Sequence, residues 1–236
     1  MKIHRFVGPW QLAVGRMRID DPNVARQMRV VLRLEVGEHV VVADGLGMEA
    51  QCTIAGYQAD AVVLECSSVQ ATTREPARKV TLFLSILKAD HFESACRQAT
   101  EAGVYEIVPV VASRTVKHGV RIDRVEKIVR EAAEVAGRAV VPRVHEAMSF
   151  DDALSLAHTL DVNICFDTDP KARAAVALKT VTRVGVWIGP EGGWHTSELE
   201  TFDRLGIARC TLGELVLRAD TATAVSVFIL AHKAVV

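Results

Sequence analysis

Two segments in the C-terminal third carry the residue types best suited to binding a small ligand. The first, Ile188-Gly189-Pro190-Glu191-Gly192-Gly193-Trp194, follows an apolar run at 184–189. Adjacent glycines permit positive φ angles and let backbone amides approach a ligand closely, while the proline stiffens the entry. An apolar strand that runs into such a loop and then into a helix is typical of an anion or nucleotide site. The same glycines could also serve only to turn the chain.

The second segment, Leu212 to Ala222, reads LGELVLRADTA and precedes an apolar helix. Exposure of its three leucines to solvent would be unfavourable. They could instead line a pocket for a flat apolar ring, although core packing also explains them. Arg218 and Asp220 stand just before the helix. They could act on a substrate, or they could form a local ion pair or a helix cap.

Several common catalytic signatures are absent from the sequence. There is no GxGxxG after the first strand, no GxxxxGK[ST], no HExxH and no GxSxG, which disfavours an ordinary dinucleotide-binding fold. The eight histidines form no metal-ligand pattern, so we expect no metal. The cysteines are five in number and include no CxxC pair, which disfavours a disulfide scaffold and fits a reducing cytoplasm. They are Cys52, Cys66, Cys96, Cys165 and Cys210.

The chain after Lys79 alternates between strand-like and helix-like runs, and these elements must position the two segments. Strands are expected at 80–87, 104–111, 162–167, 184–189 and 208–213. Helices are expected at 89–103, 121–138, 149–160, 197–205 and 219–236. This alternation predicts an α/β domain with a mainly parallel sheet, in which ligands bind beyond the carboxyl ends of the strands.

The first third of the chain has a different pattern. Short β-branched or alternating runs at 40–45, 48–57 and 61–69 predict closely spaced strands of a small barrel or sandwich. A polar stretch at 68–78, which contains Pro76, separates these strands from the α/β part. We therefore expect two domains, at residues 1–70 and 79–236.

Composition and charge limit the classes of partner. The chain has 236 residues, of which 50% are hydrophobic, and a formal net charge of −1, which argues against a strongly basic nucleic-acid binder. Basic residues are nevertheless concentrated at 1–34, with seven against two acidic residues, and at 114–143, with eight against four. Such stretches could contact phosphates or could be ordinary solvated faces. With no apolar run long enough for a membrane span and no signal peptide, we expect a cytoplasmic protein.

Together and in this order, IGPEGGW and LGELVLRADTATAV resemble the signature of the RsmE family, bacterial 16S ribosomal RNA uridine-N3 methyltransferases of the SPOUT superfamily. The resemblance extends over nearly the whole chain and includes Arg5-Phe6, Lys88 and the segment 99–109. The chain departs from the family at three places. Arg26-Gln27-Met28 replaces the usual His-His-Leu, Val135-Ala136 replaces Gln-Ser, and Asp220 replaces a glutamate.

The resemblance implies both a fold and an activity. The expected fold is a PUA-like β-barrel that binds RNA at 1–70, followed by a SPOUT domain at 79–236 with a parallel sheet and a deep trefoil knot. The expected activity is methylation of the N3 of a uridine in the decoding region of 16S ribosomal RNA, with S-adenosylmethionine as cofactor. The small ribosomal subunit is then the expected partner, and the chain is expected to form a homodimer.

The resemblance also assigns residues to roles. Uracil N3 carries a proton, so a base or a charge-stabilising cation would help the reaction, and Arg218, Asp220 and Glu191 are the catalytic candidates, with no order among them. The cofactor-binding candidates are Phe166, Thr168, Ile188, Gly189, Pro190, Gly192, Gly193, Thr211, Leu212, Gly213, Leu215, Leu217, Thr221 and Ala222. The candidate RNA contacts are Arg5, Arg16, Arg26, Arg29, Arg33, Lys88, Arg114 and Arg138.

Two other functions remain open at this point. One is a non-catalytic RNA-binding or ribosome-assembly module that keeps the fold and binds no cofactor. The other is a SPOUT enzyme that methylates a ribose 2′-oxygen of another RNA.

Overall fold

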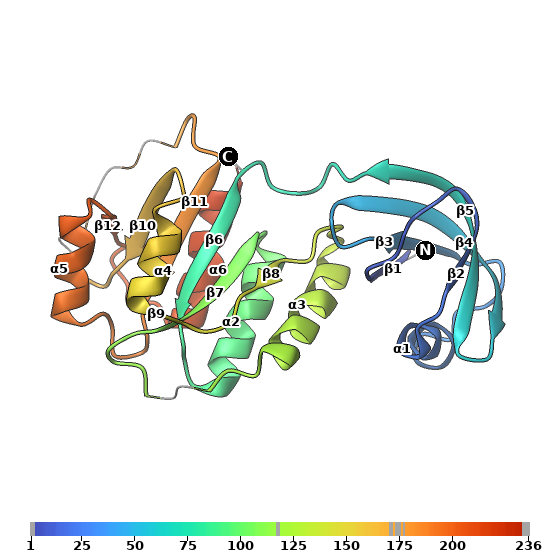
Figure 1. Cartoon of the computed structure of the whole chain (residues 1–236), viewed down its shortest axis with the longest axis horizontal. Helices are drawn as coiled ribbons and strands as arrows, with labels where there is room; N and C mark the ends of the chain where they lie inside the picture. The colour runs from blue at the N-terminus through green and yellow to red at the C-terminus, as the bar shows by residue number, and fades with distance from the viewer. Residues whose placement is uncertain (1–2, 117–118, 170–171, 173–175, 177, 233–236) are drawn as a thin grey trace. The chain divides into compact units, whose positions relative to one another are not determined.

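The computed structural model describes residues 3–116, 119–169, 172, 176 and 178–232, and it contains two compact units (Figure 1). The first unit comprises Met1–Glu75 and Ala133–Val141, and the second comprises Pro76–Ala132 and Pro142–Val236. The chain therefore leaves the first unit at Glu75 and returns to it for nine residues from the end of helix α3 (Ile122–Ala136). The domain ranges expected from the sequence did not include this return.

The first unit is built on a five-stranded sheet in the order β1-β3-β4-β5-β2, in which only the β1–β3 pair is parallel. The strands are β1 (His4–Val7), β2 (Gly15–Ile19), β3 (His39–Ala43), β4 (Met48–Gln58) and β5 (Ala61–Ala71). Helix α1 (Pro22–Arg26) begins at Asp21, whose carboxylate accepts two backbone N–H groups, and continues into the π-helical turn η1 (Gln27–Val31). The predicted strands β3, β4 and β5 are confirmed, whereas β1, β2 and α1 were not predicted.

The cysteines of this unit correct an expectation from the sequence. Cys52 on β4 and Cys66 on β5 are joined by a disulfide, although the odd cysteine count had suggested none. The pairing follows from the antiparallel register, which places the two residues opposite each other across a bulged hairpin. Since a disulfide is present, the cysteine count no longer favours a reducing compartment. Cys96, Cys165 and Cys210 form no disulfide.

The second unit contains a parallel sheet with the central order β12-β10-β11-β6-β7-β8, and β9 pairs with β7. Its strands are β6 (Lys79–Ser85), β7 (Glu106–Val111), β8 (Arg143–Val144), β9 (Met148–Ser149), β10 (Val162–Phe166), β11 (Arg183–Ile188) and β12 (Ala208–Cys210). Every pairing in this sheet is parallel, which confirms the predicted α/β fold class. Because the strands run in one direction, their carboxyl ends gather at one edge.

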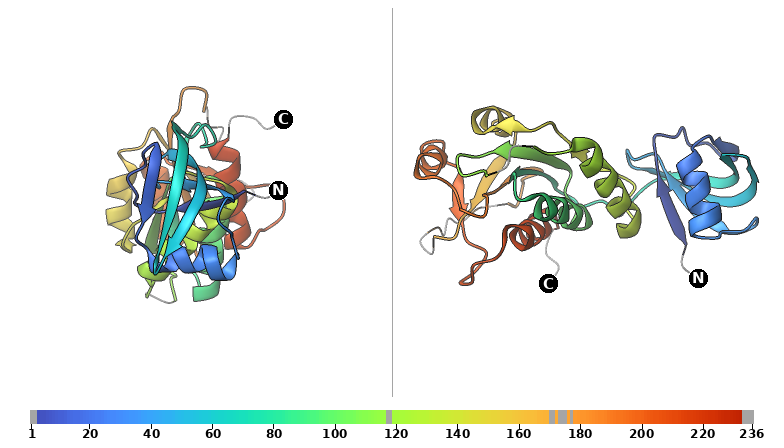
Figure 2. Two further views of the ribbon diagram at one scale, coloured as in Figure 1. Left: turned by 90° about the vertical axis from the view of Figure 1, so that its right-hand side faces the viewer. Right: turned by 90° about the horizontal axis from the view of Figure 1, so that it is seen from below.

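Helices cover both faces of this sheet (Figure 2). Helices α2 (Ala89–Glu101) and α6 (Ala219–Ala231) lie side by side on one face, and α4 (Phe150–Ala157) and α5 (Thr196–Arg204) pack on the other. Helix α4 is capped by Ser149, whose Oγ accepts the backbone N–H of Asp152. The C-terminal helix was expected to reach residue 236; it ends at Ala231, and residues 233–236 lie outside the described part of the chain.

An aromatic cluster fills the core between the sheet and helices α4 and α5. Trp187 on β11 is fully buried and stacks on Phe83 of β6, with ring centroids 4.2 Å apart. Phe202 and Trp194 meet the indole edge to face. The Nε1–H of Trp187 donates to Asn163 Oδ1 at 3.2 Å, so the polar atom of this buried ring has a hydrogen-bond partner. The cluster supports the loop that follows β11, because Trp194 belongs to that loop.

Candidate active site

A cavity of about 690 Å³ opens beyond the carboxyl ends of four neighbouring strands of the second unit, β6, β10, β11 and β12. Its walls come from segments at and just after the ends of these strands, namely Leu87, Lys88, His91, residues 166–168, 188–194 and 211–220, and Ala222. A volume of several hundred cubic ångströms is typical of a small-molecule or cofactor site. The position agrees with the rule that ligands of parallel α/β sheets bind at this edge.

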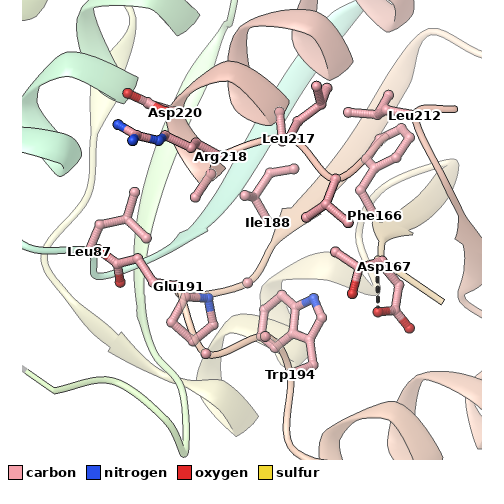
Figure 3. Close-up of a pocket in the computed structure, with 18 of the residues that line it drawn as sticks. Leu87, Phe166, Asp167, Ile188, Glu191, Trp194, Leu212, Leu217, Arg218 and Asp220 are labelled. Carbon is pink, nitrogen blue, oxygen red and sulfur yellow. Dashed lines mark hydrogen bonds between the residues drawn. The ribbon is translucent and has the colours of Figure 1, made fainter. Parts of the chain in front are cut away.

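The two sides of the cavity differ in chemistry (Figure 3). The apolar side chains of Phe166, Leu212 and Leu217 lie on one side, near the end of β10. Arg218 and Asp220 lie together at the start of α6 on the other side. One side therefore suits a flat apolar ring, and the other suits a group that reacts or carries charge.

Most of the residues predicted to bind the cofactor line this single cavity. They are Phe166, Thr168, Ile188, Gly189, Pro190, Gly192, Gly193, Thr211, Leu212, Gly213, Leu215, Leu217 and Ala222. Thr221 is not among the lining residues and instead donates its backbone N–H to Asp220. The three catalytic candidates Glu191, Arg218 and Asp220 line the cavity, as does Lys88, which was predicted to contact RNA.

Two glycines of the lining have a structural requirement for their small size. Gly213 has a φ of +125°, a conformation that residues with a Cβ rarely adopt. A Cβ on Gly189 would lie 3.1 Å from Trp194 Nε1, closer than the ring can easily accommodate. Gly192 differs, because a Cβ there would make only an ordinary contact with Arg114.

Polar contacts fix the loop after β11 to its neighbours. Glu191 accepts the backbone N–H of Lys88 at 3.2 Å, which ties the loop to the start of α2. Arg114 Nη1 donates to the carbonyl oxygen of Gly192 at 2.8 Å. Arg114, which was predicted to bind RNA, therefore contacts this loop. Glu191, which was predicted to be catalytic, holds the loop in place.

An ion pair beneath the apolar side was not found by sequence reasoning. Asp167 lines the cavity, and its carboxylate accepts the Thr168 N–H at 2.7 Å and Arg209 Nη2 at 2.6 Å. This hydrogen bond from Arg209 to Asp167 is the main cause that raises the pKa of the guanidinium. Arg209 also contacts Asp203 at 3.2 Å. The pair joins the ends of β10 and β12, and no spacing rule signals such a contact between residues 42 positions apart.

The basic residues predicted to bind RNA fall into two groups in the first unit. Arg16, Arg26, Arg29 and Arg33 are exposed. Arg5 and Arg138, which were predicted to contact RNA, are instead buried. Their side chains are only 5% and 7% exposed and form ion pairs with Glu49 and Glu75, each at 2.8 Å. A buried, paired guanidinium cannot reach a phosphate without leaving its partner uncompensated.

The described residues include neither a metal-ligating cluster nor a membrane-spanning helix. No group of three or more His, Cys, Asp or Glu side chains within residues 3–116, 119–169 and 178–232 could hold a metal ion. No helix in the described part of the chain is long and apolar enough to cross a membrane.

Comparison with known proteins identifies the class of protein to which this fold and cavity belong. Residues 73–231 match the RNA methyltransferase domain family. This match covers about two thirds of the chain, which belongs to that family. The resemblance inferred from the two loop segments is thereby confirmed.

Three of the relatives that the chain resembles share one name within this family. The chain is 28% identical over 208 residues to the ribosomal RNA small subunit methyltransferase E of Bacillus subtilis, covering 81% of this chain and 80% of the relative. It is 31% identical over 154 residues to the Mesomycoplasma hyopneumoniae protein of that name, covering 63% of this chain and 67% of the relative. A crystal structure of the Neisseria gonorrhoeae enzyme of that name, bound to S-adenosyl methionine, has a TM-score of 0.88 at 26% identity and covers 97% of both chains.

Proposed function

We propose that this protein methylates the N3 of a uridine in the decoding region of 16S ribosomal RNA, using S-adenosylmethionine. The observation that carries the proposal is the cavity at the edge of the parallel sheet, where the two loop segments of the resemblance come together. The small-subunit methyltransferases to which the chain is similar support the class of substrate. The proposal places the protein in the cytoplasm, where ribosomes are assembled.

The cavity suits S-adenosylmethionine, which supplies an electrophilic methyl group on a positively charged sulfur. Phe166, Leu212 and Leu217 offer apolar surface to an adenine ring. The glycine-containing loops after β11 and β12 expose backbone N–H and C=O groups for its polar edge. Methyl transfer is an in-line displacement, so the loops must hold donor and acceptor close and collinear.

The charged side of the cavity suits the uridine. N3 becomes nucleophilic when its proton leaves, and the ring then carries negative charge. Arg218 can stabilise that charge or bind the phosphate of the target nucleotide, because a guanidinium stays protonated and offers several donors. Asp220 stands two residues away at the start of α6 and can accept a proton or orient a group that does.

The finer features of the fold are part of the proposal. After β12, at the edge of the sheet, the chain returns to its centre as α6, which packs against β6 and β11. Such a return supports a SPOUT-type trefoil knot. In the first unit, the small, mostly antiparallel sheet supports a PUA-like barrel, and the exposed side chains of Arg16, Arg26, Arg29 and Arg33 support its contact with the RNA backbone.

The decisive experiment uses small ribosomal subunits from a strain that lacks the corresponding enzyme. We expect the protein and S-adenosylmethionine to add one methyl group to the N3 of one uridine, located by mass spectrometry of nuclease fragments. Free 16S RNA, tested in parallel, shows whether the assembled subunit is required. A ribose methyl would instead indicate the 2′-oxygen activity, and a lack of cofactor binding in calorimetry would indicate a non-catalytic module.

Replacement of Gly213 tests the cofactor loop. We expect Gly213→Val to weaken S-adenosylmethionine binding about 10-fold to 100-fold, because a β-branched residue at a φ of +125° costs about 1–3 kcal/mol or displaces the loop. Isothermal titration calorimetry measures the effect. Gly119→Val is the matched control, since a Cβ at Gly119 meets nothing within 4 Å and Gly119 does not line the cavity. Equal affinity of Gly213→Val and the parent would contradict the loop assignment.

A second prediction concerns the homodimer. Helix α6 exposes Phe228 and Ile229, which are 46% and 56% accessible in the single chain. We expect light scattering at micromolar concentration to give the mass of a dimer, and Ile229→Asp to shift it to that of a monomer. Val135→Asp is the control, because Val135 is exposed on α3. A parent protein that is monomeric and fully active would rule out the dimer.

A further inference from the structure

His91 lies at the charged side of the cavity and has no part in the roles proposed for Arg218 and Asp220. It belongs to the first turn of α2, where its backbone N–H donates to the carbonyl oxygen of Lys88 at 2.9 Å. Its side chain lines the cavity and is 44% exposed. His91 Nδ1 lies 4.0 Å from Asp220 Oδ2, so an imidazole and a carboxylate from two different helices face each other across this side of the site.

Asp220 is held in an orientation that favours this pairing. Its Oδ1 accepts the backbone N–H of Thr221 at 2.9 Å, which leaves Oδ2 directed to His91. The carboxylate is 19% exposed, so it is more sheltered than the imidazole. A distance of 4.0 Å is longer than a hydrogen bond, but catalytic hydrogen bonds commonly shorten only when the substrate is bound.

Resting on the proposed function, we propose that His91 is the general base of the reaction and that Asp220 orients it. In the reacting complex, the N3–H proton of the uridine passes to the imidazole as the bond from N3 to the methyl carbon forms and the bond from sulfur to that carbon breaks. Asp220 holds the Nδ1 side of the ring and stabilises the imidazolium, which then releases its proton to solvent. The products are the N3-methylated uridine, the neutral thioether and one proton.

The other ionisable groups that line the cavity are less suited to this role. Lys88 and Arg218 are cations and cannot accept a proton while charged. Glu191 is engaged with the backbone N–H of Lys88, and Asp167 is engaged with Arg209 beneath the apolar side. Glu214 also lines the cavity, but it is exposed on the loop after β12. Imidazole is the side chain best able to accept a proton near neutral pH and release it again. This division gives Arg218 the stabilisation of charge and leaves proton transfer to His91 and Asp220.

Single-turnover methylation of small subunits tests the proposal. We expect His91→Gln to lower the rate about 10²-fold to 10⁴-fold, the usual range for loss of a general base, with S-adenosylmethionine affinity within about twofold of the parent. His91→Gln combined with Asp220→Asn should be little slower than His91→Gln alone, because the two residues act as one unit. His158→Gln is the matched control, since His158 is exposed at the end of α4 away from the cavity.

Two further readouts separate a base from a merely structural residue. Added imidazole should restore part of the activity of His91→Ala and should have no effect on the parent. In ¹⁵N spectra of histidine-labelled protein at fixed pH, Asp220→Asn should move the His91 ring signals and leave those of His158 in place. This second measurement needs neither cofactor nor RNA.

Each outcome decides between the alternatives. Any of three results would overturn the proposal. These are a rate of His91→Gln within a few-fold of the parent, no rescue of His91→Ala by imidazole, or His91 ring signals that Asp220→Asn leaves unchanged. Loss of cofactor affinity equal to the loss of rate would make His91 a cofactor ligand instead of the base. If the parent and His158→Gln both fail to methylate any small-subunit uridine, the proposed function fails, and the assignment of His91 falls with it.

Discussion

Arg218→Lys is expected to slow single-turnover methylation of the small subunit by about 10²-fold to 10³-fold, the usual loss when one stabilising donor is removed from a reaction centre. Arg218 lies at the N-terminal end of α6 and lines the charged side of the cavity. Lysine keeps the charge but not the planar pair of donors that a uracil oxygen or a phosphate can bind together. Affinity for S-adenosylmethionine should stay near that of the parent.

The control for Arg218→Lys is Arg204→Lys. Arg204 is exposed in the last turn of α5 and contacts Thr201 of its own helix. We expect its substitution to leave the rate unchanged. If Arg218→Lys had the parent's rate, the guanidinium would not stabilise charge in the reaction. His91 and Asp220 would then act without it.

Trp187→Ala should lower the free energy of unfolding of the second unit by about 3–5 kcal/mol. The indole is fully buried, stacks on Phe83 and donates to Asn163, so truncation leaves a cavity and an unpaired amide oxygen. Urea unfolding followed by circular dichroism measures the change. Trp187→Phe keeps most of the ring and should cost less than half as much.

Trp10→Ala is the comparison for this core prediction. Trp10 is a partly buried residue that packs against the core of the first unit, and its truncation should destabilise the protein less than Trp187→Ala. If both alanine variants lower stability equally, the aromatic cluster does not have the central role that its packing suggests. Because Trp194 belongs to that cluster and lines the cavity, Trp187→Ala should also weaken cofactor binding.

The sequence predicted well what depends on local patterns. The runs at 80–87 and 184–189 are continuous apolar segments of the kind that form buried parallel strands, and they pair as β6 and β11. The two loop segments meet because the carboxyl ends of parallel strands share one edge, the edge where the sequence predicted that ligands bind. Almost every residue predicted from them to bind the cofactor lines the cavity.

Contacts between distant residues were not predicted, because composition and spacing carry no record of them. Strand β1 has four residues and pairs in parallel with β3, more than thirty positions later, so no hairpin signal marks it. The disulfide of Cys52 and Cys66 depends on strand register. His91 is a lone histidine in a helix, and only the placement of α2 beside α6 brings it near Asp220. That the strand before it ends at the same sheet edge is the one signal that could have drawn attention to His91.

The return of residues 133–141 to the first unit means that this unit cannot finish folding as soon as residues 1–75 have been synthesised. Val7 N–H donates to Glu134 at 3.0 Å, Gly47 N–H donates to the Ala139 carbonyl at 3.2 Å, and Ala139 packs with Val7 and Ala43. The N-terminal 75 residues emerge first, yet these partners follow only after the 57 residues of 76–132 have been made. The first unit therefore cannot complete these contacts until residues 133–141 have been synthesised. A fragment cut at residue 75 lacks that segment and should be less stable than the same unit in the full chain.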